Sequence, residues 1–162
     1  MELRKGDRKS AVYQLSRALQ DCPKDGELWG LAIEMENKLT RKRFSIDAMQ
    51  KTDNAPQTIV SVAKIFWKEK KYHKARKWFD RAVMLNPDLG DSWVYYYAFE
   101  RDVADNGKSE EILKRCVKAE PHHGRLWISI SKKPGNWRLK TEEILRIGIK
   151  GIKEDIDKIE WL

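Results

Sequence analysis

The chain has 162 residues, of which 41% are hydrophobic and 36% are charged, and its formal net charge at pH 7 is +8. It is too apolar for a disordered tail, and its apolar runs are shorter than the roughly 20 residues that cross a bilayer. The first nine residues lack the apolar segment of a secretion signal, and two cysteines are too few for a disulfide scaffold, so a reducing compartment such as cytosol or nucleus is predicted.

Apolar residues recur at helical spacing in almost every segment between the Pro, Gly and Asn residues, whereas the alternation typical of strands is nearly absent. The sequence therefore predicts an all-α fold. The predicted helices, in chain order, cover residues 8–20, 26–38, 41–51, 57–69, 72–85, 90–104, 108–119, 123–132 and 140–159.

One pattern recurs four times, at intervals of 30, 34 and 34 residues: a small residue, a large apolar residue four positions later, another small residue three further on, and usually a proline five beyond that. Three sets fit it completely, and the set that begins at Arg41 fits the spacing, with Asp53 in place of the proline. A tryptophan follows the proline after six residues, as Trp29, Trp93 and Trp127. A fixed period of this length is typical of stacked helical hairpins. The four sets are Ala11/Leu15/Ala18/Pro23, Arg41/Ser45/Ala48/Asp53, Ala75/Phe79/Ala82/Pro87 and Ser109/Leu113/Cys116/Pro121.

The first helices of two hairpins carry a tryptophan followed by a glutamate seven residues later, Trp29 with Glu36 and Trp93 with Glu100. This pair is typical of half-a-tetratricopeptide (HAT) repeats, whereas the unit that contains Phe79 lacks both residues and resembles an ordinary tetratricopeptide (TPR) repeat. The predicted fold is a right-handed α-α superhelix, or solenoid, of HAT and TPR hairpins with a C-terminal capping helix. The predicted structural positions are Ala18, Trp29, Glu36, Ala48, Phe79, Ala82, Trp93, Glu100, Cys116 and Trp127.

The period predicts one repeat domain over residues 1–162. It contains a partial repeat at 1–23, repeats at about 24–53, 54–87, 88–121 and 122–153, and a last helix at about 140–160. Because residues 1–5 resemble the tail of an incomplete helix, we expect a fragment of a longer solenoid, whose uncovered Leu15, Ala18 and Leu19 predict self-association. The last helix is expected either to cap the stack or to form a seam for a partner helix.

No catalytic, cofactor-binding or metal site is predicted. The chain has none of the phosphate-binding, dinucleotide-binding, zinc-protease or nucleophile-elbow motifs. Cys116, His122 and His123 would offer at most three nearby ligands without a second pair, which does not favour a structural zinc site. The sequence therefore predicts a binding protein, with no enzyme activity and no cofactor.

Two kinds of residue are candidates for partner binding, and each has two interpretations. Tyr95 and Tyr97 either pack on a neighbouring repeat or provide an aromatic anchor for a partner. Basic clusters are either solvated helix faces or contacts for RNA or acidic proteins. The basic candidates are Lys70, Lys71, Lys74 and Lys77, with Arg41, Lys42 and Arg43, and two further clusters lie at 114–118 and at Lys132, Lys133, Arg138 and Lys140.

Several segments, loops included, carry a more specific signal than the repeat spacing. They are RALQDCP at 17–23, SVAKIFW at 61–67, KARKWF at 74–79, LGDSW at 89–93, FE at 99–100, KRC at 114–116, AEP at 119–121, HGRLW at 123–127 and NW at 136–137. In this order they resemble the C-terminal repeats of the pre-mRNA-processing factor six family.

This resemblance implies a nuclear, non-enzymatic scaffold that helps to bridge the snRNPs within the spliceosomal tri-snRNP. Its expected partners are other spliceosomal proteins, with some RNA contact and no membrane. The alternative is an RNA-contacting HAT module of a spliceosomal or mRNA 3′-end-processing complex.

Overall fold

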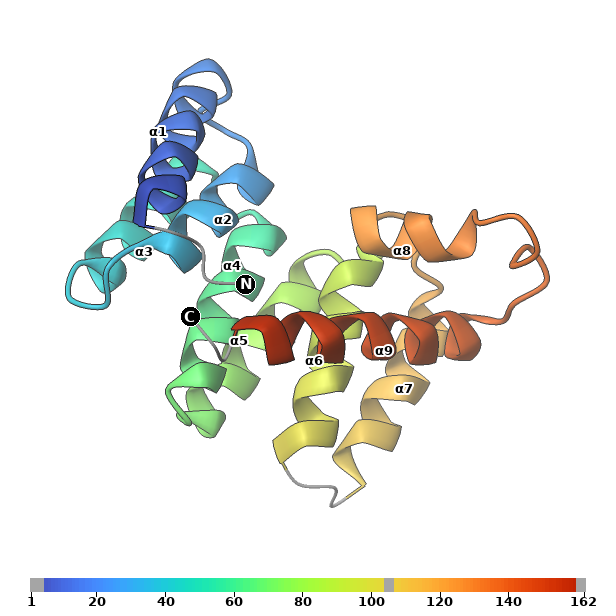
Figure 1. Ribbon diagram of the computed structural model, residues 1–162. Coiled ribbons are helices and arrows are strands. Elements are labelled where there is room, and N and C mark those ends of the chain that lie inside the picture. The colour runs from blue at the N-terminus through green and yellow to red at the C-terminus, as the bar shows by residue number, and fades with distance from the viewer. Residues whose placement is uncertain (1–4, 104–106, 160–162) are drawn as a thin grey trace. The chain divides into compact units, whose positions relative to one another are not determined.

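The computed structural model describes residues 5–103 and 107–159, with side chains described for 7–103 and 107–152. These residues form helices joined by short turns and contain no strand, only an isolated bridge between Leu89 and His123 (Figure 1). The predicted all-α repeat fold is confirmed. The helices are α1 (Lys5–Asp21), α2 (Gly26–Met35), α3 (Arg41–Lys51), α4 (Pro56–Lys68), α5 (Tyr72–Leu85), α6 (Gly90–Val103), α7 (Lys108–Ala119), α8 (Arg125–Ser131) and α9 (Thr141–Ile159).

Local sequence signals account for where these helices begin. The Asp25 carboxylate accepts hydrogen bonds from the backbone N–H groups of Glu27 and Leu28, which would otherwise lack partners in the first turn of α2. Pro56 occupies the first position of α4, where its missing N–H costs no helical hydrogen bond.

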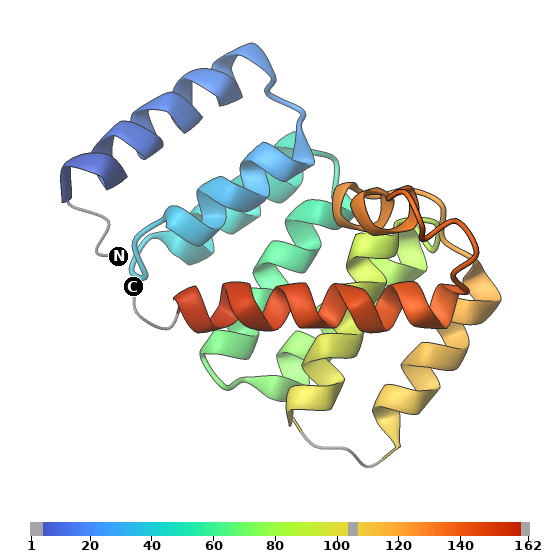
Figure 2. The ribbon, with the colours of Figure 1, turned by 45° about the vertical axis from the view of Figure 1, so that its right-hand side comes forward.

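The chain divides into two compact units, residues 1–78 and 79–162, and the division falls within α5. In the first unit α2 packs against α1, α3 and α4, as Figure 2 shows from a second side. The single repeat domain and its repeat boundaries stay predictions. The core of this unit contains Trp29, Ile33, Ala48, Val62 and Ile65, surrounded by Leu19, Phe44, Phe66 and Trp78.

Small residues allow α2 and α4 to approach closely. A Cβ atom placed on Gly30 would lie 2.5 Å from the Ser61 hydroxyl oxygen, so a larger residue here would require the Ser61 side chain to move. Ala48 on α3 is completely buried beside the same core. Ala18 on α1 is only half-buried, as are Leu15 and Leu19. Self-association through this face of α1 stays a prediction.

The second unit is built around α6, which packs against α7, α8 and α9. The ring of Phe79 stacks on Tyr96 at 5.7 Å and tilts against Phe99 at 5.2 Å between centroids. Because α6 has neighbours on several sides, most of its residues are buried, as its apolar pattern predicts. The buried residues of α6 are Gly90, Ser92, Trp93, Val94, Tyr96, Tyr97, Ala98, Phe99 and Glu100.

Arg115 on α7 links three parts of this core. Its guanidinium pairs with the Asp80 carboxylate at 2.9 Å and lies 5.6 Å from the ring centroid of Trp93. Burial, with help from Asp80 and Glu100, raises the pKa of the nearby Tyr96 hydroxyl to about 12. Tyr96 therefore stays neutral at all physiological pH values.

The fixed spacing between proline and tryptophan has a physical cause. The indole N–H of Trp29 donates to the Pro23 carbonyl oxygen at 2.9 Å, and the indole N–H of Trp93 donates to the Pro87 carbonyl oxygen at 2.8 Å. The bond ties the turn after one hairpin to the first helix of the next.

Trp127 is used differently. Its ring lies directly against Gly90, where even one added Cβ atom would overlap the indole. The two loops beside this contact are joined by the backbone, because the Gly90 N–H donates to the His123 carbonyl oxygen at 2.8 Å. The Asp91 carboxylate also accepts bonds from the backbone N–H groups of Leu126 and Trp127, which start α8.

The last helix covers the second unit. Ile144, Leu145, Ile149 and Ile152 are buried where α9 packs against α6, α7 and α8. Over residues 141–152 this matches the predicted cap, since one face is apolar and covered. The side chains of Ile156 and Ile159, which the sequence places on the same stripe, lie outside the described residues.

Trp93 tests the proline–tryptophan bond. Trp93→Ala should lower the free energy of unfolding by about 3–5 kcal/mol, since it removes a buried aromatic side chain. Trp93→Phe keeps most of the ring but leaves the Pro87 carbonyl without its donor, so the expected loss is only about 1–3 kcal/mol. Urea unfolding measures both values. A loss close to zero for Trp93→Phe would show that the hydrogen bond contributes nothing.

Gly90 and Gly151 form a matched pair. Gly90→Ala should destabilise the chain by about 1–3 kcal/mol, because the added methyl group collides with Trp127. Gly151→Ala, in α9 with no atom within 4 Å of the new methyl group, should be neutral or stabilise by up to about 1 kcal/mol. Thermal unfolding of both variants is the measurement. A neutral Gly90→Ala would contradict the described packing.

Candidate functional site

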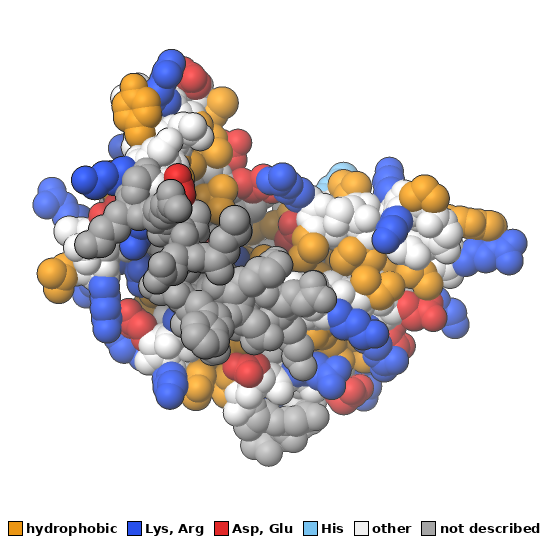
Figure 3. Space-filling view, viewed as in Figure 1, with side chains coloured by type: hydrophobic (Ala, Val, Ile, Leu, Met, Phe, Trp, Pro, Cys, Tyr) orange, Lys and Arg blue, Asp and Glu red, His pale blue; other side chains and the backbone are white. Residues whose placement is uncertain are grey.

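Basic side chains are spread over the molecule. On the face shown in Figure 3, Lys and Arg side chains alternate with hydrophobic and acidic ones. No helix within the described residues is long and apolar enough to span a membrane. The same residues contain no group of three His, Cys, Asp or Glu side chains that could hold a metal ion.

The neighbouring histidines serve the loop in which they lie. The His122 and His123 rings contact the two Asp88 carboxylate oxygens at 3.1 and 3.0 Å. Desolvation raises the pKa of Asp88, but the ring and backbone hydrogen bonds of His122 and the charge of His123 outweigh it, so the pKa lies below its usual value. With both rings more than two-thirds exposed, this cluster is a surface link between two loops.

Neither cysteine forms a disulfide in the described structure. Cys116 is fully buried, and its burial raises the pKa of the thiol to about 12. A thiol with such a pKa is almost entirely protonated near neutral pH and is a poor nucleophile. Cys116 therefore acts as a small packing residue of α7, like the alanines at corresponding positions.

The two candidate tyrosines differ in exposure. Tyr97 is only 2% exposed, and the Arg101 guanidinium lies 5.8 Å from its ring centroid. This burial matches the packing interpretation of Tyr97 and leaves no accessible face for a partner. Tyr95 is half-buried and engaged within the chain. Tyr97 is buried because α6 has neighbours on several sides, which the residue pattern of a single helix does not reveal.

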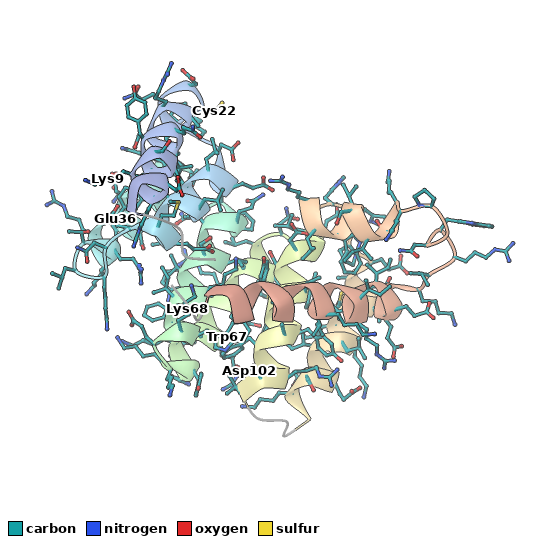
Figure 4. The ribbon with its side chains drawn as sticks, in the orientation of Figure 1. Lys9, Cys22, Glu36, Trp67, Lys68 and Asp102 are labelled. Carbon is teal, nitrogen blue, oxygen red and sulfur yellow. The ribbon has the colours of Figure 1, made fainter. Side chains whose placement is uncertain are left out.

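The predicted basic cluster on α3 divides into two roles. The half-buried Arg41 donates from its guanidinium to the Glu36 carbonyl oxygen at 2.9 Å and so closes the end of α2. Figure 4 shows Glu36 at the turn between α2 and α3. Lys42 and Arg43 line an open depression on α3. Arg41 thus has a structural role that the sequence prediction missed.

This α3 depression combines apolar and basic side chains. Leu39 is 90% exposed and Ile46 is 47% exposed, while Lys42 and Arg43 provide positive charge beside them. Asp47, also in the lining, pairs with Lys51 at 3.2 Å, which leaves the depression with net positive character. Its lining residues are Leu39, Lys42, Arg43, Ile46, Asp47 and Gln50. Sequence analysis missed Leu39 and Ile46, although both are apolar residues off the buried stripe.

The remaining basic candidates lie on or just before α5. Lys70, Lys71, Lys74 and Lys77 are all exposed. Lys71 pairs with Glu69 at 2.9 Å, and the Lys74 amine lies 5.9 Å from the ring centroid of Phe66. They form a solvated row of positive charge on and just before α5.

A mixed charge cluster lies between α2 and α4. The Lys64 amine pairs with Glu34 at 3.0 Å. Partial burial lowers the pKa of the Lys68 amine, Glu34 offsets part of this effect, and Lys64 and Arg41 add to it. Figure 4 places Lys68 at the end of α4.

Comparison with known proteins confirms the resemblance seen in the sequence. The chain is 43% identical over 113 residues to human Pre-mRNA-processing factor 6, which covers 70% of this chain and 12% of that protein. It is 43% identical over 115 residues to Protein STABILIZED1 of Arabidopsis thaliana, 71% of this chain and 11% of that protein. It is 37% identical over 149 residues to Pre-mRNA-splicing factor prp1 of Schizosaccharomyces pombe, 92% of this chain and 16% of that protein.

The chain thus spans between 11% and 16% of the length of these three relatives. No family model matches it.

The Asp88 link predicts a small pH-dependent contribution to stability. Because the pKa of Asp88 is lowered in the folded chain, its contacts stabilise the fold above the ordinary value of 3.8 and lose this effect as the pH falls through the folded value. Asp88→Asn should therefore melt at a lower temperature than the parent chain at pH 6. The gap should close below pH 3.8. A constant gap across this range would show that the charge of Asp88 is irrelevant.

Proposed function

Because the chain is homologous to the pre-mRNA-processing factor 6 family, we propose that it is a helical-repeat module that acts in the nucleus as a non-enzymatic protein–protein scaffold in splicing. In this role it helps to hold the snRNPs together within the tri-snRNP. The proposed partners are other spliceosomal proteins.

The observation that carries this proposal is identity of 37–43% to proteins named as pre-mRNA-processing or splicing factors. The match to the fission yeast protein runs over 92% of the chain, so it includes turns as well as helices.

The α3 depression is the surface that we propose for a protein partner. Exposed Leu39 and Ile46 supply apolar area, which drives most protein association, and Lys42 and Arg43 would orient an acidic segment beside them. The depression is open to solvent. It therefore suits a helix or an extended peptide with apolar and acidic side chains better than a small molecule.

The alternative role, contact with RNA by a spliceosomal or 3′-end-processing module, is favoured by the exposed row at Lys70, Lys71, Lys74 and Lys77. These amines could neutralise phosphates without reading bases. Binding of that kind weakens steeply with salt. Apolar contacts at Leu39 and Ile46 would be much less sensitive to salt, so the two roles differ in a measurable way.

The test is capture from nuclear extract treated with ribonuclease, read by mass spectrometry. The immobilised chain should retain splicing proteins. Leu39→Asp/Ile46→Asp should retain several-fold less of them, because two charges replace the apolar contact area. The matched control is Val12→Asp/Tyr13→Asp, which changes two exposed apolar residues of α1 in the same unit.

Three outcomes would contradict parts of this proposal. Retention that disappears on ribonuclease treatment would favour the RNA role. Enrichment of 3′-end-processing proteins in place of splicing proteins would change the assigned complex. Equal retention by the two double variants would remove the α3 depression as the binding surface.

A further inference from the structure

The loop at residues 132–140, between α8 and α9, carries the most exposed aromatic ring among the described residues. Trp137 is 74% exposed. Figures 1 and 2 show this loop extending beyond the ends of α8 and α9. An indole contributes to folding mainly through burial and its N–H bond, and at this exposure the ring gains little from burial. The proposed protein surface on α3 does not include this loop.

Hydrogen bonds within the loop fix its path. The Asn136 N–H donates to the Lys133 carbonyl oxygen, and the Leu139 N–H donates to the Asn136 carbonyl oxygen, both at 3.0 Å. The Asn136 side-chain amide donates to the Ile130 carbonyl oxygen, also at 3.0 Å, which anchors the turn to α8. Gly135 has a positive φ of 92°, which a side chain would strain. Trp137 is therefore presented by a built turn.

The charge around this ring has one sign. Lys132, Lys133, Arg138 and Lys140 lie within nine residues that contain no Asp or Glu. The Arg138 guanidinium lies 4.4 Å from the ring centroid of Trp137 and so covers one face of the indole. Figure 3 shows Lys and Arg side chains beside hydrophobic ones at this end of the unit.

The acidic residues that follow the loop are already engaged. The Glu142 carboxylate pairs with Arg146 at 2.6 Å, and the Glu143 carboxylate accepts a bond from the Lys140 backbone N–H at 2.8 Å. No ion pair in the described part of the chain involves Lys132, Lys133, Arg138 or the Lys140 amine. Their positive charge is thus available to a ligand.

A flat ring beside unpaired cations fits nucleic acid better than an acidic peptide. Peptide anchors usually enter an apolar pocket, whereas Trp137 stands in solvent. Every base has a flat face that can stack on an aromatic ring, and neighbouring Lys and Arg contact the phosphates. Only unpaired bases can stack in this way, since those of a duplex are already stacked and its grooves are read by other means.

We propose that loop 132–140 binds single-stranded RNA. One base stacks on the open face of Trp137, and phosphates contact Lys132, Lys133, Arg138 and Lys140. This site goes beyond the proposed protein scaffold, and its residues differ from the lysine row on α5.

The experiment is fluorescence anisotropy of the 162-residue chain with a labelled ten-nucleotide single-stranded RNA of mixed sequence, at 50 and 200 mM salt. Trp137→Ala should bind roughly 5- to 150-fold more weakly, the range expected for loss of one stacked base. Trp137→Phe should restore most of the affinity. Because Trp137 is exposed, circular dichroism should show both variants folded.

Charge is tested with two matched double variants. Lys132→Gln/Lys133→Gln should make the log–log salt dependence of binding shallower by about 1.4, at about 0.7 per phosphate contact on a single strand. Lys42→Gln/Arg43→Gln removes the same charge from the α3 depression and should leave RNA binding nearly unchanged.

Four results would overturn the proposal: no binding at 50 mM salt, equal affinity of Trp137→Ala and the parent chain, an equal loss in both double variants, or polyglutamate competing as well as unlabelled RNA. The last would assign the loop to an acidic protein. None of them bears on retention of splicing proteins at the α3 depression, so the two proposals fail separately.

Discussion

The hydrogen bond from an indole N–H to a proline carbonyl six residues earlier is the constraint on which the hairpin pattern depends. Proline ends the preceding helical segment, and its carbonyl oxygen lies where the chain turns, beyond the reach of the helical ladder. The indoles of Trp29 and Trp93 satisfy that oxygen and bury a large ring in the same step. A single residue therefore fixes both the turn and the first helix of the following hairpin.

Close approach of helices follows from this arrangement. Once the indole fixes the start of α2 or α6, neighbouring elements can fit only where side chains are small, as at Gly30 against Ser61 and at Gly90 against Trp127. Trp127, the third tryptophan of the repeating pattern, packs against Gly90, which lies one period earlier in the sequence. Tryptophans at the same spacing therefore pack in two ways: Trp29 and Trp93 bond a proline carbonyl, and Trp127 packs on a glycine.

The helices and most buried positions were predictable because the spacing of apolar residues that specifies them can be seen in a short stretch of sequence. Helices α3, α5 and α7 have the predicted limits, and the others differ from them by a few residues at most. The hydrogen bond of Arg41 and the burial of Tyr97 could not be predicted from the period. Arg41 is held by a carbonyl at the end of another helix, and Tyr97 is covered because α6 has several neighbours. Such contacts depend on tertiary structure, which no single helix pattern contains.

The exposed apolar residues were also not predictable from helical periodicity. Leu39 and Trp137 lie between helices, where no period indicates which side chains are covered, and their exposure appears only once the turns around them are described. Turn 133–139 closes through its own backbone and the Asn136 amide, without any bond from the Trp137 indole. The fold therefore places this ring without depending on it. Because the turn closes without this ring, the exposed indole is available for the proposed contact with RNA.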